Sequence, residues 1–373
     1  MIYNNVVGII FSNMHDGRLP QLTKQRTMGS VPYGGRYRAI DFVLSNMVNS
    51  GISKVGVITK HNFQSLMDHL GSGKAWDLSR KREGLYILPP FGYNNSVYQS
   101  RVEALHGISN FLTHCREEHV IMGDCHIIYS MDYTPALETH ISKNADITIV
   151  YKNSVMPEEL PGKVTLELGR AGKVESIVVG EQETDKCNWG IGVYIVKKSY
   201  LIDVVQKAMA RGKLDFERNI LQEACTVDRV YAYKFSGYAG LISTMKDYFD
   251  ANMAILKPSV RKDLFMADRP VYTKERDDMP AKLGLGAKAT TSSIADGCIV
   301  EGEVENSVLF RGVKVGKGAR VRNCILMQDC VVGENCDINY IVADKDVTLG
   351  EGFTACGCKE EPYYIPKGSS LEK

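Results

Sequence analysis

The chain of 373 residues has no excess of charge of either sign, because 45 Lys and Arg stand against 44 Asp and Glu. A general nucleic-acid-binding surface needs a basic excess, so the composition argues against such a partner. No apolar run has the length of a membrane span. Residues 1–5 lack the basic start and the apolar core of a signal peptide, and we therefore expect a cytoplasmic protein with no membrane partner.

Cysteine spacings typical of metal sites are also missing. The ten Cys are scattered, and most stand singly inside apolar stretches, as Cys298 and Cys324 do. In a cytosolic chain such thiols are usually small buried hydrophobes. Cys356 and Cys358 form the only close pair, but one intervening residue is a poor zinc spacing, and no second pair or His cluster accompanies them. We therefore predict structural cysteines and no metal site.

What the sequence does contain, over roughly its first 255 residues, is an alternation of strand-like and helix-like segments. This alternation indicates an α/β domain with a mostly parallel sheet. The apolar run at residues 6–11 is typical of a strand covered on both faces. Residues 164–168 and 174–179 predict a hairpin, and residues 247–256 predict a closing helix that Pro258 ends.

The last third of the chain has a different pattern. From about residue 294, isolated apolar residues recur among Gly and small residues with a period near six. This is the hexapeptide pattern of a left-handed β-helix, with a plain β-sandwich as the alternative. A β-helix leaves faces and an end that need a neighbour, so we expect oligomers. The predicted domains are residues 1–256 and 286–373, joined by a Pro-containing, charge-rich linker at 257–285.

Several stretches carry a family resemblance. Residues 31–42 read Val-Pro-Tyr-Gly-Gly-Arg-Tyr-Arg-Ala-Ile-Asp-Phe, residues 128–133 read Ile-Tyr-Ser-Met-Asp-Tyr, and residues 190–194 read Gly-Ile-Gly-Val-Tyr. Together with the α/β and hexapeptide layout, they resemble the glucose-1-phosphate adenylyltransferase family over essentially the whole chain. The resemblance implies a Rossmann-like nucleotidyltransferase domain followed by the left-handed β-helix.

The family makes ADP-glucose and pyrophosphate from ATP and glucose 1-phosphate. It uses a Gly-rich loop that holds the triphosphate, cationic side chains, and Mg²⁺ held by two carboxylates. Here the loop spans residues 12–19 and contains a single Gly, and only Arg18 and the Leu after it match the family. Side chains hinder close approach of backbone to phosphate, and Asp16 adds repulsion. Met28 stands where the resemblance implies a Lys.

The carboxylates that the resemblance implies are also incomplete. Asp124 matches one of them, but Leu241 stands at the position of the other and cannot bind Mg²⁺, which takes oxygen ligands. The base-site segment at residues 100–104 has become Ser-Arg-Val-Glu-Ala, and the sugar-phosphate motif is not recognisable near residues 178–181. No catalytic residue is assigned beyond the remnants Arg18, Arg26 and Asp124.

Five losses on an intact scaffold resemble the non-catalytic D-type subunit of the bacterial enzyme, which pairs with a catalytic C-type subunit in glycogen synthesis. The resemblance implies a regulatory subunit that binds the catalytic subunit in a homo- or heterotetramer. It further implies that this chain alone needs no cofactor, although the family reaction uses Mg²⁺.

A phosphorylated-metabolite effector is a second partner that the resemblance implies. Arg36 replaces a family effector-site Lys, and Arg38 follows on the same segment. Arg320 and Arg322 are similar to the Arg pair of the β-helix that faces this site. Arg suits bidentate phosphate recognition. We therefore predict an anion site at these four residues, with a solvated face or an interdomain salt bridge as the alternative.

Two other functions stay open. A nucleotidyltransferase with a divergent phosphate-binding loop would use Arg18, Arg26 and Asp124. A β-helix acyltransferase would need a catalytic His in the coil, and residues 286–373 contain none. His15 has no partner visible in the sequence, so we do not assign it to catalysis.

Overall fold

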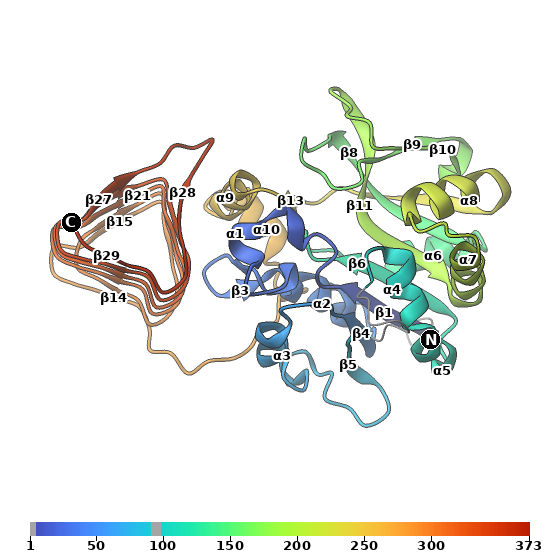
Figure 1. The fold of residues 1–373 in the computed structure, drawn as a ribbon, viewed down its shortest axis with the longest axis horizontal. Coiled ribbons are helices and arrows are strands. Elements are labelled where there is room, and N and C mark those ends of the chain that lie inside the picture. Colours follow the sequence, from blue (N-terminus) through green and yellow to red (C-terminus); the bar gives the residue numbers. More distant parts are fainter. Residues whose placement is uncertain (1–4, 91–97) are drawn as a thin grey trace.

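The computed structural model describes residues 5–90 and 98–373, which form an α/β domain followed by a β-helix (Figure 1). The strands of the α/β domain are β1 Val6–Phe11, β2 Pro32–Tyr33, β3 Tyr37–Arg38, β4 Lys54–Ile58, β5 Gly84–Leu88, β6 His119–Asp124, β7 Ile127–Ile128, β8 Ile147–Val155, β9 Val164–Leu168, β10 Val174–Val179, β11 Lys186–Lys197, β12 Val230–Phe235 and β13 Gly240–Leu241. Nine of them form one sheet in the order β10-β9-β11-β6-β1-β4-β5, with β8 between β11 and β12.

The centre of this sheet is parallel. Strand β1 pairs in parallel with β4 and β6, and β4 pairs in parallel with β5. Every residue of β1 is buried, as its continuous apolar run predicts for a strand covered on both faces. The long strand β11 runs antiparallel to β6 and β8, which the apolar pattern does not reveal. The predicted hairpin is confirmed as the antiparallel pair β9 and β10.

Helices cover both faces of the sheet. They are α1 Pro20–Thr23, α2 Ala39–Asn49, α3 Gln64–Leu70, α4 Arg101–Gly107, α5 Ser109–His114, α6 Thr134–Ser142, α7 Lys198–Ala210, α8 Gln222–Val227, α9 Met245–Ala254 and α10 Pro258–Leu264, with shorter turns at Asp16–Arg18, Met28–Ser30, Lys74–Trp76, Arg170–Gly172 and Glu217–Leu221. Helix α9 ends before Pro258, but that residue then begins α10 inside the predicted linker. Proline is well tolerated at the first helical position, where its missing N–H costs nothing.

The C-terminal domain is a prism of three parallel sheets (Figure 1). The first sheet consists of β14 Lys282–Leu283, β17 Ile299–Val300, β20 Lys314–Val315, β23 Val331–Val332, β26 Thr348–Leu349 and β29 Ser370–Leu371. The second consists of β15 Lys288–Thr290, β18 Glu303–Glu305, β21 Arg320–Arg322, β24 Asp337–Asn339 and β27 Thr354–Cys356. The third consists of β16 Ser293–Ile294, β19 Val308–Leu309, β22 Ile325–Leu326, β25 Ile341–Ala343 and β28 Tyr363–Ile365. Stacked aliphatic side chains such as Val304, Val321 and Ile338 fill the interior. These parallel sheets are those of a left-handed β-helix, not of a sandwich.

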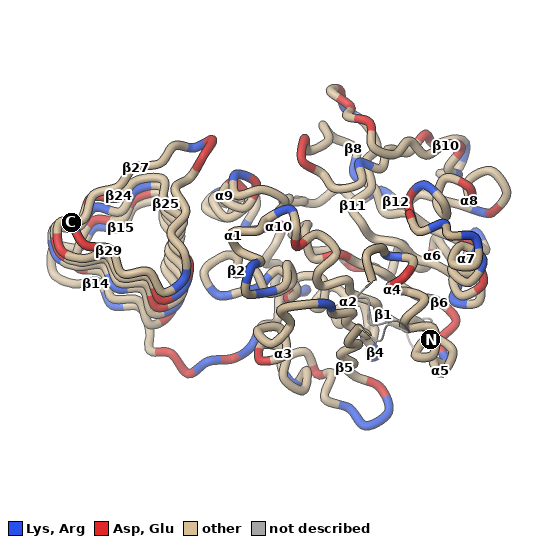
Figure 2. The backbone as a smooth tube through the Cα atoms, viewed as in Figure 1, with Lys and Arg blue, Asp and Glu red and all other residues tan. Residues whose placement is uncertain are grey.

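The third sheet of the β-helix packs against the α/β domain. Val308, Ile325 and Val342 belong to the same buried apolar cluster as Phe42 of α2 and Phe249 of α9. A single core therefore extends across both domains and fixes how they sit against each other. Figure 2 shows Lys and Arg interspersed with Asp and Glu over both domains, in keeping with the near-neutral composition. Over the residues that the structure describes, no helix combines the length and apolarity that a membrane crossing requires.

Candidate functional site

The topology brings the loop at residues 12–19 and Asp124 to the same edge of the sheet. Strands β1 and β6 are parallel, and Phe11 at the end of β1 lies opposite Asp124 at the end of β6. In open α/β sheets, ligands bind beyond the carboxyl ends of parallel strands. The region formed by residues 12–19, Met28, Asp124 and Leu241 is therefore where a nucleotide would be expected, and we call it the degenerate site.

The loop of the degenerate site uses its own backbone donors. The N–H groups of Arg18 and Leu19 donate to the carbonyl groups of His15 and Asp16, at 3.0 and 3.3 Å. The Asp16 carboxylate accepts a hydrogen bond from the N–H of Met28 at 2.7 Å, and burial raises the pKa of Asp16 to about 7. These three donors are bonded within the chain and are therefore not free to join a cradle for a triphosphate.

Two further positions of the degenerate site are apolar. Met28 is buried in the core that spans both domains, and its uncharged side chain cannot neutralise a phosphate as the expected Lys would. Leu241 lies on β13, which pairs antiparallel with β7 just beyond Asp124, and faces Ile127 in that register. The topology thus brings the two metal-ligand positions together, as the resemblance implies, but one of them offers a hydrocarbon side chain.

Arg101 engages the remaining carboxylate. Its Nη2 donates to Oδ2 of Asp124 at 2.7 Å, and the side chains are 5% and 3% exposed. The guanidinium lies 4.4 Å from the ring centroid of Phe11, and its Nε is 3.5 Å from the carboxylate of Glu217. Burial opposes the charge of Asp124, but the attraction of Arg101 outweighs it and holds the pKa of Asp124 well below its ordinary value.

Mg²⁺ does not fit this arrangement. It demands near-octahedral oxygen coordination, usually through one or two carboxylates and substrate phosphates. Here the Leu241 side chain has no oxygen to offer, and the side chains nearest Asp124 present the nitrogen atoms of Arg101, His15 and His126 instead. We therefore derive no catalytic step through Mg²⁺.

A second site lies between the two domains, in a cavity of about 280 Å³ that we call the interdomain pocket. The α/β domain, the segment after α10 and the β-helix all contribute to its wall. Six Lys and Arg line it: Arg36, Arg38, Lys274, Arg276, Arg311 and Lys345. Carboxylates lie close to several of these cations: Asp278 is 3.5 Å from Arg276 and 3.6 Å from Arg311, and Asp296 is 4.0 Å from Arg36.

Burial and mutual repulsion destabilise the charged forms of the cations in the interdomain pocket. The side chain of Arg311 is 8% exposed, and its Nε has no hydrogen-bond partner among the described residues. Burial, and then the neighbouring Arg38 and Arg26, lower the pKa of Lys345 to about 7. Burial also lowers the pKa of Arg38 to about 10. A bound anion would relieve this repulsion, so the charges of the pocket suit an anionic ligand.

Comparison with known proteins places the chain in a family. The nucleotidyl transferase family model matches residues 8–258, and the model described as GlmU-like, C-terminal hexapeptide matches residues 279–361. The chain is 30% identical over 369 residues to the glycogen biosynthesis protein GlgD of Bacillus subtilis (strain 168), covering 99% of this chain and 97% of that protein. It is 32% identical to the glucose-1-phosphate adenylyltransferase of Bacillus cytotoxicus, covering 93% and 94%. The chain belongs to the glucose-1-phosphate adenylyltransferase family.

The three catalytic remnants of this family have different ion-pair partners, although Arg18 and Asp124 lie at the same edge of the sheet. Arg18 is half exposed and lies 3.6 Å from Glu159. Arg26 is buried and donates to both carboxylate oxygens of Asp344 on the β-helix, at 2.8 Å each. Asp124 is paired with Arg101 instead. Each remnant thus has a partner of its own, and Arg26 serves the domain interface.

His15 has the partners that sequence reasoning did not find. Its Nε2 lies 3.7 Å from Oδ2 of Asp124, and its ring centroid is 4.2 Å from that of His126. Sequence reasoning also missed Arg101. Its position is fixed by Ser100, which caps α4 in a capping box with Glu103 and so makes Arg101 the first residue of the helix. The sequence shows the capping signal, but it does not show the direction in which α4 points.

The predicted pairing of Arg36 and Arg38 with Arg320 and Arg322 is not what the structure shows. Arg320 and Arg322 lie on β21 in the second sheet of the β-helix, where they are exposed and neighbour Glu303 and Asp337. The third sheet, not the second, faces the α/β domain, and the hexapeptide period does not say which face that is.

Other residues of the β-helix take their place in the interdomain pocket. Arg311, Gln328 and Lys345 occupy equivalent positions in three successive rungs, each two residues after a residue that pairs in register in the third sheet. This polar ladder was visible in the sequence as a repeat. Its significance depends on the packing of the two domains.

Proposed function

We propose that this chain is a non-catalytic, regulatory subunit of glucose-1-phosphate adenylyltransferase in glycogen biosynthesis. The observation that carries the proposal is the Arg101 guanidinium 2.7 Å from Asp124, in a site whose second carboxylate position is Leu241. The likeness to GlgD, a protein named for glycogen biosynthesis, and to several adenylyltransferases supports the pathway and the partner. The partner is a catalytic subunit of the same family.

Assembly through the β-helix is part of the proposal. Among the described residues, the first strand of its first sheet, β14, has an unpaired edge, and both Leu283 on this strand and Leu285 just after it are exposed. Open strand edges and exposed apolar side chains are stabilised by a neighbouring chain. We expect tetramers that combine this chain with the catalytic subunit, or copies of this chain when that subunit is absent.

The interdomain pocket is the regulatory element in this proposal, and a phosphorylated metabolite is its ligand. Phosphate oxygens suit the guanidinium groups of Arg36, Arg38 and Arg311, which reach the pocket from both domains. An anion held by both domains stabilises the conformation in which they are docked. If the catalytic partner prefers that conformation, the anion changes its activity through a coupling free energy.

Sulfate binding to the pocket is expected to weaken as the pH rises from about 6 to about 8. Lys345, with its pKa lowered to about 7, loses its proton over this range, whereas sulfate keeps its charge. Burial lowers the pKa of the neighbouring His69 below its ordinary value of 6.5, so its ring adds little positive charge in the upper part of this range. Lys345→Met should bind sulfate about tenfold more weakly at pH 6, since a charge-assisted hydrogen bond contributes about 1.5–3 kcal/mol.

Isothermal titration calorimetry of the whole chain checks this. Lys345→Met should also lose most of the pH dependence. The exposed Lys288 on β15 offers a matched control, and Lys288→Met should bind sulfate like the wild type. A wild-type affinity that stays constant, or rises, between these pH values would count against the assigned role of Lys345.

The regulatory role is tested by mixing this chain with a catalytic glucose-1-phosphate adenylyltransferase and following pyrophosphate release. We expect a mixed complex in analytical ultracentrifugation and a changed rate or substrate affinity. Arg311→Ala should alter the response of the mixture to phosphorylated effectors and leave the complex intact. Absence of a complex together with an unchanged rate would contradict the proposal.

A further inference from the structure

A cluster of three metal-ligating side chains lies at the end of β6. One ligand atom from each of His15, Asp124 and His126 lies within 4.8 Å of the other two. Nε2 of His15 and Nδ1 of His126 are 3.7 and 4.0 Å from Oδ2 of Asp124. Nitrogen and oxygen ligands stand about 2.0–2.2 Å from Zn²⁺, so atoms at these separations reach a common ion by small side-chain rotations.

Two polar atoms of this cluster are buried without a hydrogen-bond partner among the described residues. They are Nδ1 of His126 and Oδ1 of Asp124, on side chains that are 4% and 3% exposed. A buried polar atom left unsatisfied costs about 1–3 kcal/mol, and most native structures avoid it. Oδ2 of Asp124 already accepts from Arg101, so a cation held by Oδ1 of Asp124 and Nδ1 of His126 would satisfy both unpartnered atoms.

Gly192 packs directly against the cluster. A Cβ atom at this position would lie 3.1 Å from Oδ2 of Asp124 and 3.4 Å from Cε1 of His126. The backbone of Gly192 has a φ of 74°, a conformation that other residues rarely adopt. A side chain at this position would press on Asp124 and His126, so the glycine allows both groups to keep their places in the cluster.

The local charge is compatible with a cation. Arg101 contributes one positive charge, but it lies between the carboxylates of Asp124 and Glu217, so the three groups together remain negative. A divalent ion would therefore meet the net negative charge of these three groups beside the two imidazole rings. The hydrogen bond from Arg101 also orients Asp124, as outer-shell partners of metal ligands commonly do.

We propose that His15, Asp124 and His126 bind a divalent transition-metal ion of the zinc class. Imidazole nitrogen suits Zn²⁺ and Co²⁺, whereas Mg²⁺ prefers oxygen, so the same edge of the sheet that does not fit Mg²⁺ fits these ions. The ion joins the loop at residues 12–19, through His15, to the end of β6. It stabilises the degenerate loop and has no part in nucleotide transfer, so the inference goes beyond the regulatory role.

Titration of the metal-free, full-length chain with Co²⁺ and Zn²⁺ tests the site. Cys356 and Cys358 are exposed thiols that would compete for both ions, so the titrations are made with both residues changed to Ser. We expect a single Co²⁺ ion per chain, with visible absorption and no thiolate charge-transfer band. Zn²⁺ should displace Co²⁺ and raise the melting temperature, and a large excess of Mg²⁺ should do neither.

His15→Ala is the decisive variant, because the His15 side chain is 21% exposed and its loss leaves the core intact. It should weaken Co²⁺ binding by at least about tenfold, and His126→Gln should do the same. His61→Ala, at an exposed position, serves as the matched control and should bind like the parent. Unchanged affinity in His15→Ala, or no Co²⁺ absorption in the parent, would overturn the site. Neither result bears on the regulatory role, which is read from turnover of the mixture.

Discussion

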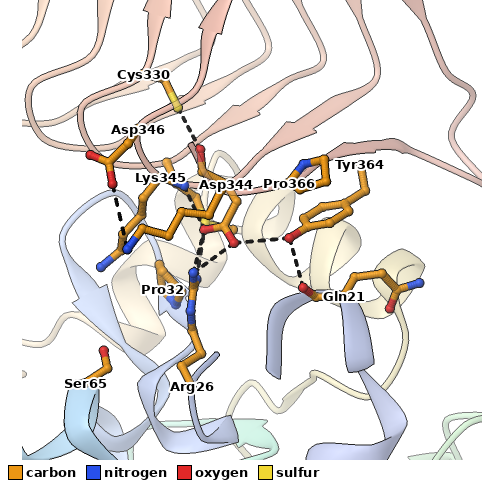
Figure 3. A network of polar contacts seen from close by, with 12 residues as sticks. Gln21, Arg26, Pro32, Ser65, Cys330, Asp344, Lys345, Asp346, Tyr364 and Pro366 are labelled. Carbon is orange, nitrogen blue, oxygen red and sulfur yellow. Dashed lines mark hydrogen bonds and ion pairs between the residues drawn. The ribbon is translucent and has the colours of Figure 1, made fainter. Parts of the chain in front are cut away.

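Replacing Asp344 by Asn is expected to lower the free energy of unfolding by about 3–5 kcal/mol, because it leaves the buried Arg26 without a counter-charge. Nη2 of Arg26 lies 2.8 Å from both oxygens of Asp344, and the side chains are 6% and 3% exposed. The hydroxyl of Tyr364 lies 3.2 Å from the same carboxylate and 2.9 Å from the carbonyl oxygen of Gln21 (Figure 3). The network joins the β-helix to the α/β domain, so its loss loosens their contact.

Urea-induced unfolding measures this effect. Asp337→Asn is the matched control, since Arg322 and Asp337 are 2.7 Å apart on the same β-helix but 44% and 40% exposed. Exposed pairs contribute about 0–1 kcal/mol, so this variant should unfold almost like the wild type. Equal effects of the two substitutions would show that burial at the domain interface is not what makes the Arg26 pair important.

Asp124→Asn is expected to destabilise the metal-free chain by a similar amount, about 3–5 kcal/mol, because Arg101 then stays buried with only Glu217 at 3.5 Å. In a working active site the opposite is common, since catalytic carboxylates are held in strained or repulsive surroundings and their removal stabilises the fold. The sign of the change in unfolding free energy therefore distinguishes a structural Asp124 from a catalytic one.

The pH dependence gives a second readout for Asp124. Its folded-state pKa is lowered below the ordinary value of 3.8, so the ion pair contributes stability that is fully present above that pH. The contribution is lost as the pH falls further, through the lowered pKa. Acid unfolding of the wild type should therefore be steeper than that of Asp124→Asn. The exposed Asp203, paired with Lys207, provides a control, and Asp203→Asn should retain the wild-type profile.

Local patterns were enough to predict most of the scaffold. The apolar run of β1, the β9–β10 hairpin and the rungs of the β-helix each follow from side-chain periodicity over a few residues. Pro258 shows the limit of such signals, since the same residue can end one helix or begin the next. The difference depends on whether the following residues find a core to pack against, as Leu264 does.

The candidate sites depend on contacts that are distant in sequence. Arg101 meets Asp124 because α4 begins beside the end of β6, and Arg26 meets Asp344 across the domain interface. A motif comparison shows that Leu241 replaces a family carboxylate. It does not show that the Arg101 guanidinium lies beside the remaining carboxylate, Asp124. The face of the β-helix that meets the α/β domain is likewise set by packing.

Pyrophosphate release from Mg-ATP and glucose 1-phosphate by the purified chain alone is the most direct test of its non-catalytic character. The account predicts no release above background, because Leu241 leaves the Mg²⁺ site one carboxylate short and Arg101 already donates a hydrogen bond to the other. A catalytic glucose-1-phosphate adenylyltransferase, assayed alone in parallel, establishes that the conditions support turnover. Release by this chain alone that Asp124→Asn abolishes would contradict the account and identify a working nucleotidyltransferase.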